Sequence, residues 1–253
     1  MEFEGKVALV TGAGSGIGKA SALRLAAGGA RIAVLSLTAA EANTTVKTIT
    51  SSGGQAIAIA ADVADEAAMR RAIDQAIAAY GQLDIVVANA GINGVWAPID
   101  DITPAEWDRT IAINLRGTYL TLHLTVPHLK RGGGGSIIIV SSINGARTFS
   151  TAGATAYTAT KAAQLAITQQ LALELGKHRI RVNAVLPGST ETSIGLSTTK
   201  RNTDLANVPV IWPEGEIPLT GGKLGQVEDV ADVVAFLSSD ASRHVTGCPI
   251  YVD

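Results

Sequence analysis

Short runs of β-branched and aliphatic residues alternate along the whole chain with longer segments in which apolar residues recur at helical spacing. Apolar runs of about four to eight residues are typical of buried strands, and the helical segments between them indicate βαβ units. The expected strands lie near residues 6–11, 31–36, 55–61, 83–88, 136–141, 180–185 and 249–252. The expected helices lie near residues 17–28, 39–51, 65–80, 104–130, 155–177 and 226–239.

This alternation predicts one doubly wound α/β domain over residues 1–253, with about seven parallel strands and helices on both faces of the sheet. No linker, composition shift or internal repeat interrupts the pattern. Residues 188–225 differ, because they are rich in Gly, Thr and Pro and show no clean periodicity. Long loops in compact domains are usually functional, so we expect this segment to form a loop or lid over a substrate.

The composition supports a globular chain. Apolar residues make up 47% of the 253 residues and charged residues 17%, which excludes a disordered chain and fits buried parallel strands. The formal net charge is -2, and no run of Lys and Arg is clustered enough to neutralise a phosphate backbone. We therefore expect no nucleic-acid partner.

Nothing in the sequence predicts export, a membrane segment or a metal site. The segment from Met1 to Lys6 lacks the basic-then-apolar layout of a signal peptide, and no later stretch approaches the ~20 apolar residues of a transmembrane helix. The lone Cys248 suits a reducing compartment, so we expect a cytoplasmic protein. The four histidines show no metal-ligand spacing with one another or with Cys248.

A glycine-rich loop, Thr11-Gly12-Ala13-Gly14-Ser15-Gly16-Ile17-Gly18, follows the first expected strand. Glycines permit a tight turn and a close approach of the backbone to a pyrophosphate, and the next helix would present its N-terminal amides. A glycine-rich turn without a ligand is the alternative interpretation. The position between a strand and a helix favours a dinucleotide site.

The spacing G-x-x-x-G-x-G in this loop resembles that of the short-chain dehydrogenase/reductase family, and the resemblance covers essentially the whole chain. Ala88-Asn89-Ala90-Gly91 resembles the family's motif after strand four, and Asp62-Val63 resembles its adenine-contacting pair. Residues 181–188 are similar to its sixth strand and following turn. The resemblance implies a Rossmann fold, NAD or NADP as cofactor, and a small carbonyl or alcohol substrate. The cofactor-binding residues that it implies are Gly12, Ser15, Gly16, Ile17, Gly18, Ser36, Leu37, Asp62, Val63, Asn89, Ala90, Gly91, Tyr157, Lys161, Pro187, Gly188, Thr190 and Thr192.

The choice between NAD and NADP is normally decided at the end of strand two, where an acid binds the ribose or a basic residue accommodates a 2′-phosphate. Ser36, Leu37 and Thr38 stand there, and none of them is charged. Ser15 also occupies a loop position where some NADP-using relatives carry a basic residue. Both cofactors therefore remain open.

Tyr157 and Lys161 lie four residues apart on an expected helix, which places both side chains on one face. Such a pair is common on helix surfaces, but here it matches the family's Tyr-x-x-x-Lys motif. The resemblance implies that Tyr157 is the general acid/base. A phenol has a pKa of about 10, which is too high for proton transfer near neutrality, so we expect the Lys161 cation to lower it.

The resemblance assigns two further catalytic residues. Ser142 matches the family's serine, which would polarise the substrate oxygen, and Ser141 is the near competitor. Asn114 matches the helix asparagine whose backbone helps to hold a water next to the lysine. The alternative for Asn114 is a polar residue that bends an apolar helix.

The substrate pocket is expected on the loops that leave the strand ends. Its candidate residues are Asn93, Trp96, Ser142, Ile143, Arg147, Tyr157 and Trp212. Arg147 would anchor an acidic substrate, although an isolated loop arginine is more often solvated, and the two tryptophans could equally be packing residues.

Three function hypotheses follow. The first is a reductase or dehydrogenase of ketones and secondary alcohols. The second is a cofactor-binding regulator without turnover, which the complete set of Asn114, Ser142, Tyr157 and Lys161 argues against. The third is an enoyl reductase or an epimerase on the same scaffold, which the short Tyr-x-x-x-Lys spacing and the chain length disfavour.

Helices 104–130 and 155–177 are apolar over more than one stripe, so we expect a homo-oligomer, either a dimer or a tetramer. The family resemblance implies the same assembly through the equivalent helices. Relatives usually continue beyond the position of Asp253 with glycines and a short tail that can contribute to a second interface, so we expect a homo-oligomer without specifying four subunits.

Overall fold

The computed structural model describes residues 1–146, 151–207 and 221–253. Its main sheet has seven strands in the order β3-β2-β1-β4-β6-β7-β9, and all the pairings are parallel. The strands of this sheet are β1 (Val7–Thr11), β2 (Arg31–Ser36), β3 (Gln55–Ala60), β4 (Ile85–Ala88), β6 (Gly135–Val140), β7 (Ile180–Pro187) and β9 (Pro249–Val252). The predicted doubly wound α/β domain is confirmed.

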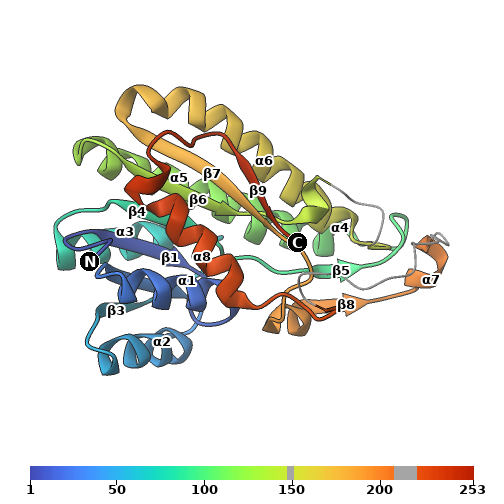
Figure 1. Ribbon diagram of the computed structural model, residues 1–253. Helices are drawn as coiled ribbons and strands as arrows, with labels where there is room; N and C mark the ends of the chain where they lie inside the picture. The colour runs from blue at the N-terminus through green and yellow to red at the C-terminus, as the bar shows by residue number, and fades with distance from the viewer. Residues whose placement is uncertain (147–150, 208–220) are drawn as a thin grey trace.

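Helices cover both faces of this sheet (Figure 1). The helices are α1 (Gly16–Ala27), α2 (Ala39–Ser51), α3 (Glu66–Tyr80), α4 (Pro104–Ile111), α5 (Gly117–Arg131), α6 (Thr155–Leu175), α7 (Thr203–Ala206) and α8 (Val227–Ser238). Apolar residues of α1, α2 and α8 form one buried core with the sheet, and those of α3, α5 and α6 form the other. The pleat of the strands divides the two cores, since Val7 and Leu9 face one while Ala8 and Val10 face the other.

The single helix predicted over residues 104–130 is wrong. Helix α4 begins with a capping box between Thr103 and Glu106 and ends at Ile111. A π-helical turn, Ala112–Arg116, then separates it from α5. One extra residue in that turn changes the phase of the helix, which hydrophobic periodicity alone does not reveal.

A second, two-stranded sheet was not predicted. Strand β5 (Gly94–Trp96) pairs in parallel with β8 (Thr198–Lys200), and together they extend away from the main sheet (Figure 1). Strands of three residues are too short for an alternating pattern to identify. The expected loop over residues 188–225 therefore contains short elements, including a 3₁₀ turn at Ser193–Ser197, β8 and α7. Residues 208–220 of that loop lie outside the described residues.

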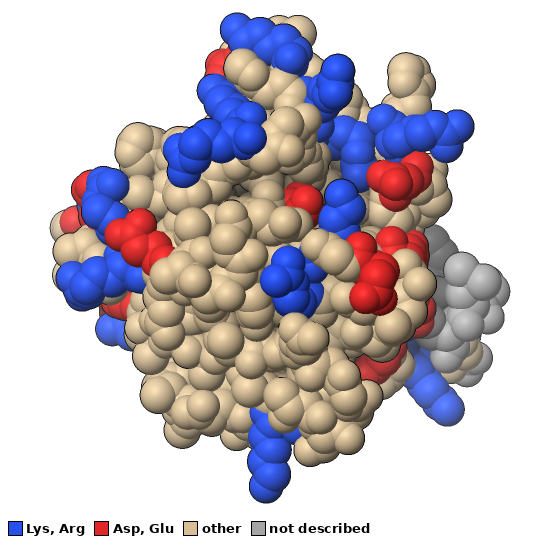
Figure 2. Space-filling view, turned by 90° about the vertical axis from the view of Figure 1, so that its left-hand side faces the viewer, with Lys and Arg blue, Asp and Glu red and all other residues tan. Residues whose placement is uncertain are grey.

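Basic residues lie in the last turn of α5 and in the short 3₁₀ turn, Gly176–His178, that follows α6. Lys130 and Arg131 end α5, and Lys177 follows α6. Desolvation lowers the pKa of His178, and the nearby charges of Lys130 and Lys177 lower it further. Figure 2 shows Lys and Arg gathered at the upper edge of one face, while most of that face carries uncharged residues. Cations at helix C-termini compensate the helix dipole, so this group has a structural explanation.

The apolar residues of the two long helices that suggested an interface differ in burial. Leu120, Leu122 and Leu175 lie in the core, whereas Tyr119 and Leu173 are 53% and 80% exposed. Packing against the sheet and against neighbouring helices accounts for part of the apolar pattern of both helices, and the two exposed residues lie outside that packing. Within the described ranges, no helix has the length and apolarity that crossing a membrane requires.

Candidate active site

A cleft of about 770 Å³ lies at the carboxyl ends of the central strands. Ligands bind at this edge in open α/β sheets because the strand order reverses there. Most of the predicted site residues line it, namely Gly12, Ser15, Gly16, Ile17, Ser36, Leu37, Asp62, Val63, Asn89, Ala90, Gly91, Ser142, Tyr157, Lys161, Pro187, Gly188, Thr190 and Thr192. Gly18 and Asn114 lie behind this surface and support it.

The glycine loop is held tightly against the first helix. A Cβ added to Gly18 would lie 2.3 Å from the Gly12 carbonyl oxygen, so only glycine allows this packing. The side-chain amide of Asn89 donates to the Thr11 carbonyl oxygen at 2.9 Å, which ties the end of β4 to the start of the loop. Ser15 precedes α1 without a side-chain cap, so the first amides of α1 have no side-chain acceptor. These features fit a pyrophosphate.

The other cofactor candidates border the same cleft. Asp62 accepts a hydrogen bond from the Ala64 amide at 2.9 Å, which shapes the turn after β3. The Gly188 amide donates to the Val252 carbonyl oxygen at 2.9 Å and so fixes the turn after β7 to β9. Thr192 faces the glycine loop, with its Cβ 3.6 Å from the position of a Cβ on Gly16. The two ends of the cleft are therefore both anchored by local hydrogen bonds.

Tyr157, Lys161 and Ser142 converge in the middle of the cleft. The Lys161 Nζ donates to the Val140 carbonyl oxygen at 2.9 Å and lies 5.5 Å from the centre of the Tyr157 ring. The Ser142 side chain lies close enough to Tyr157 to offset part of the rise that burial causes in the pKa of its phenol. The Ser141 hydroxyl instead donates to the Lys161 carbonyl oxygen at 2.8 Å. Of the two candidate serines, only Ser142 meets the tyrosine.

Burial sets the proton affinities of this group. Desolvation raises the pKa of Tyr157 above its ordinary value, and the hydrogen bond from Ser142 offsets only part of that. The expectation that the pKa of Tyr157 is lowered is therefore wrong for this structure. Desolvation also lowers the pKa of Lys161 to about 8. Near neutral pH the phenol is protonated and the ammonium still carries most of its charge.

Asn114 lies in the π-helical turn and is completely buried. Its Oδ1 accepts from the Ile92 amide at 2.8 Å, and its Nδ2 donates to the Ile92 carbonyl oxygen at 2.9 Å and to Thr160 at 3.2 Å. Its own carbonyl oxygen accepts from Gln164 at 3.0 Å. A Cβ on Gly91 would lie 3.2 Å from Asn114 Oδ1 and 3.8 Å from Lys161 Nζ. Asn114 thus holds the segment between β4 and β5 close to the lysine.

Three of the predicted substrate residues do not line the cleft. The Asn93 side chain donates to Thr198 Oγ1 at 2.7 Å, and the Trp96 indole donates to the Asn93 carbonyl oxygen at 3.2 Å. The Asn93 side chain therefore joins the segment before β5 to β8, and the Trp96 indole bonds within its own segment. Asn93, Trp96 and Ile143 are all absent from the lining of the described cleft. Arg147 and Trp212 lie outside the described residues.

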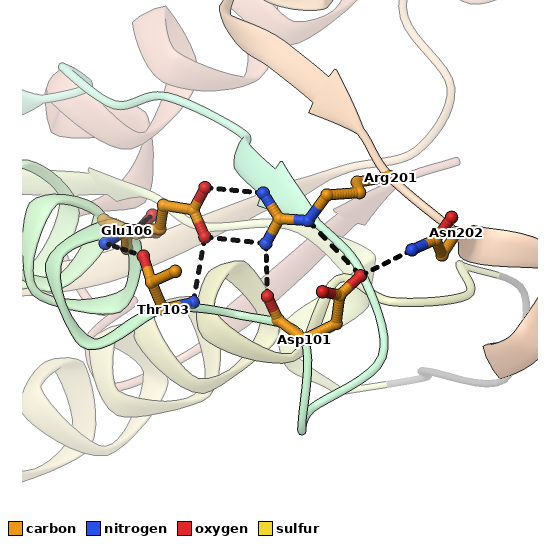
Figure 3. Close-up of polar contacts among 6 residues, drawn as sticks. Asp101, Thr103, Glu106, Arg201 and Asn202 are labelled. Carbon is orange, nitrogen blue, oxygen red and sulfur yellow. Dashed lines mark hydrogen bonds and ion pairs between the residues drawn. The ribbon is translucent and has the colours of Figure 1, made fainter.

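An ion-pair network fixes the segment after β8 to the start of α4 (Figure 3). Arg201 contacts Glu106 through two nitrogens, at 2.7 and 2.9 Å, and it also donates to the backbone of Asp101. The Asn202 amide donates to the Asp101 carboxylate at 2.9 Å. Glu106 also completes the capping box with Thr103. Sequence reasoning missed this network because its members are far apart in the chain.

Other residues that border the cleft were also missed. Glu41, Ile92, Arg109, Ile194 and Leu196 line it, and they come from helix turns and loops without a motif. Leu196 is 92% exposed, so an apolar side chain stands open at the cleft. An apolar residue in an expected loop is the only sequence signal that could have identified it. In the described ranges, no group of three or more His, Cys, Asp or Glu side chains is arranged to hold a metal ion.

Comparisons with known proteins agree with this arrangement. A family model described as "Enoyl-(Acyl carrier protein) reductase" matches residues 12–253. The chain is 38% identical over 253 residues to cis-4-hydroxycyclohexanecarboxylate dehydrogenase of Sinomonas cyclohexanicum, covering 99% of this chain and 96% of that protein. A crystal structure of a 3-ketoacyl-ACP reductase from Sinorhizobium meliloti 1021 is 61% identical, with a TM-score of 0.93 over 98% of this chain and 97% of that one. A 3-ketoacyl-(acyl-carrier-protein) reductase from Brucella melitensis complexed with NADH is 32% identical, with a TM-score of 0.86 over 99% and 98% of the two chains.

Proposed function

Since the chain belongs to the short-chain dehydrogenase/reductase family, it is an oxidoreductase of hydroxyl and keto groups, and we propose that Tyr157 is its general acid/base. The observation that carries the proposal is the buried group of Ser142, Tyr157 and Lys161 in the middle of the cleft. The relatives named above are dehydrogenases and reductases, which supports an enzyme rather than a cofactor-binding regulator.

In the reduction, Tyr157 donates its phenolic proton to the substrate oxygen while the substrate carbon accepts a hydride. A nicotinamide cofactor, when bound, supplies that hydride. Ser142 stabilises the charge that develops on the oxygen, because its hydroxyl already stands beside the phenol. Lys161 places its positive charge near the ring and so stabilises the phenolate that remains. Oxidation of an alcohol runs the same transfers in reverse.

The chain holds the cofactor along the carboxyl edge of the sheet. The glycine loop and the first amides of α1 would bind the pyrophosphate, and Asp62 and Val63 would border the adenine. The segment from Pro187 to Thr192 would border the nicotinamide. The close packing of Gly18 on Gly12 supports this assignment, since it brings the backbone of the loop to the surface of the cleft.

We assign the segment 188–225 as the substrate lid. Leu196 and Ile194 line the cleft although they are exposed, so an apolar part of a substrate would cover them. A small ketone or secondary alcohol with an apolar substituent fits this surface. Leu196→Asn should then raise KM for apolar ketones several-fold, and an unchanged KM would remove this segment from the substrate site.

The protein is further proposed to be a cytoplasmic homo-oligomer, a dimer or a tetramer. Its free Cys248 is partly exposed, which suits a reducing compartment. Tyr119 and Leu173 are exposed on α5 and α6, and burial against a second copy would remove them from water. Light scattering tests the assembly, and a particle of 25.9 kDa at micromolar concentration would contradict it.

The proposed function is tested with a panel of ketones and secondary alcohols, assayed with NADH, NADPH, NAD and NADP. The wild type should turn over at least one pair, and Tyr157→Phe should bind the same cofactor while losing turnover by orders of magnitude. Tyr80→Phe is the matched control, because Tyr80 ends α3 and does not line the cleft. Near-normal turnover of Tyr157→Phe would exclude the proposed role.

A further inference from the structure

An acidic side chain reaches the end of β2 from the helix that follows it. Ser36 ends β2, and its hydroxyl donates to the Glu41 Oε2 at 2.8 Å. Glu41 belongs to the first turn of α2, and both residues line the cleft. Positions 36–38 carry no acid, but the folded chain places a carboxylate beside them.

The Glu41 side chain does not reach back to the N-cap amide of α2, as a glutamate in the third position of a helix commonly does. Its amide donates to the Thr38 side chain, which makes Thr38 the N-cap of α2. A glutamate at this position commonly reaches back to the N-cap amide, as Glu106 does to Thr103 at 2.9 Å in α4. Glu41 accepts from Ser36 instead, so its carboxylate points toward the strand end and the cleft.

Close packing places this carboxylate beside the glycine loop. A Cβ added to Gly14 would lie 2.6 Å from the Glu41 Cβ and 2.6 Å from the Ser36 Oγ. The loop is therefore an immediate neighbour of the base of the Glu41 side chain and of the Ser36 hydroxyl that bonds its carboxylate. The end of β2 next to this loop is where a doubly wound domain receives the adenosine ribose.

We propose that Glu41 selects NAD(H) over NADP(H), which rests on the proposed function. A 2′-phosphate at the end of β2 would meet the carboxylate charge, whereas an unmodified ribose would offer hydroxyls that the carboxylate can accept from. Leu37 is 68% exposed and supplies no charge. The chain thus provides, from a helix, the acid that is normally expected on the strand.

The cations that line the described cleft belong to elements other than β2 and α2. Among the described residues that line the cleft, the cations are Arg109 and Lys161. Arg109 belongs to α4, which packs on α6 and β5. Lys161 is held at the end of β6 through Val140. Neither belongs to an element that packs on β2, so a 2′-phosphate would lack a nearby counter-charge there.

The test measures the dissociation constants of NADH and NADPH on the folded protein, with nicotinamide fluorescence as the signal. The wild type should bind NADH more tightly, and Glu41→Gln should tighten NADPH binding about tenfold with little effect on NADH, because one unit of opposing charge is removed. Glu41→Lys should extend the gain for NADPH. Glu66→Gln is the matched control, since Glu66 is an exposed first-turn glutamate of α3 that does not line the cleft.

The outcomes separate this inference from the proposed function. Binding of neither cofactor by the wild type would contradict the proposed function itself. Binding of both cofactors with a ratio that neither Glu41 variant changes would overturn the inference alone. The inference would also be overturned if the wild type bound NADPH tightly and Arg109→Gln abolished that binding. If the Glu41→Gln protein does not fold, Glu41→Lys and Ser36→Ala test the inference by the same measurement, the ratio of NADH to NADPH affinity.

Discussion

Arg201 contacts both carboxylate oxygens of Glu106, although 95 residues separate the two in the chain. The hydrogen bond from Arg201, together with the one from the Thr103 backbone, lowers the pKa of Glu106 to about 2. Arg201 also donates its backbone amide to the Trp96 carbonyl oxygen at 3.0 Å. The pair therefore fixes the end of β8 both to β5 and to the start of α4.

Arg201→Gln should loosen the segment that carries Ile194 and Leu196 without touching the reacting atoms. We expect KM for the carbonyl substrate to rise by roughly three- to tenfold, with kcat changed by less than about twofold. Arg70→Gln is the matched control, because it breaks an exposed ion pair with Glu66 on α3. A fall in kcat with an unchanged KM would contradict a positioning role for Arg201.

The same pair predicts a pH dependence. The pKa of Glu106 is lowered, so its stabilising contribution is complete above the ordinary carboxyl pKa of 4.5 and is lost as pH falls toward about 2. The ion pair of Arg201 and Glu106 should therefore cause no change in KM between pH 8 and pH 5. In Glu106→Gln, KM should be raised to a similar extent at pH 5 and at pH 8, and a rise confined to one pH would contradict the argument.

The two neighbouring serines should respond differently to substitution. Ser142→Ala removes the hydroxyl that meets Tyr157, so turnover should fall by about 10²- to 10³-fold while cofactor binding persists. Ser141→Ala removes a buried hydrogen bond to the Lys161 carbonyl oxygen and should cost about 1 kcal/mol of unfolding free energy. Equal losses of turnover in the two variants, at equal stability, would contradict the assignment of Ser142.

The sequence predicted the main sheet well because each of its strands is a buried apolar run next to a periodic helix. It also located Ser142, Tyr157 and Lys161, since their spacing matches a motif. It could not locate β5, β8 or the ion pair of Arg201, because these depend on contacts across about a hundred residues. It did not predict the π-helical turn around Asn114 either, since a change of helical phase leaves the local composition unaltered.

The same limit explains why Glu41 was missed at the cofactor end and why the pKa of the tyrosine was predicted wrongly. Glu41 lies five residues after Ser36, beyond the strand-end positions that normally indicate the cofactor preference. Only the folded chain places its carboxylate beside Ser36. The pKa of Tyr157 depends on how completely the phenol is buried, which a motif does not specify. Asn93 and Trp96 were expected in the substrate pocket because they follow a strand end, but the Asn93 side chain bonds to β8, the Trp96 indole bonds to Asn93, and neither lines the described cleft.

Asn114 should matter for stability as well as for catalysis. Asn114→Ala leaves both the amide and the carbonyl of Ile92 without their side-chain partner in a buried place, at a cost of about 2–4 kcal/mol of unfolding free energy. Asn114→Asp retains an acceptor for the Ile92 amide but loses the donor. Denaturant unfolding should therefore rank wild type above Asp and Asp above Ala at pH 8. Wild-type stability of Asn114→Ala would show that the Ile92 bonds contribute little.

The buried charge of Lys161 should lower the free energy of unfolding near neutral pH. Burial lowers its pKa from 10.5 to about 8, which corresponds to a cost of about 3 kcal/mol for keeping the charged form in the folded state near neutral pH. Lys161→Met removes that charge and fills the space of the side-chain stem. It also removes the hydrogen bond to Val140, at about 1 kcal/mol. A net stabilisation of about 2 kcal/mol is expected at pH 7, together with a loss of turnover.

The stabilisation by Lys161→Met should disappear with rising pH. A lysine whose folded-state pKa is lowered penalises the native state below about pH 8, and the penalty declines as pH rises from there to 10.5, where the unfolded chain also loses the proton. Denaturant unfolding of the wild type and the variant at pH 7 and pH 10 measures the difference. Lys130→Met, an exposed substitution at the end of α5, should show no such trend. A gain that is equal at both pH values would mean that packing, and not the buried charge, stabilises the variant.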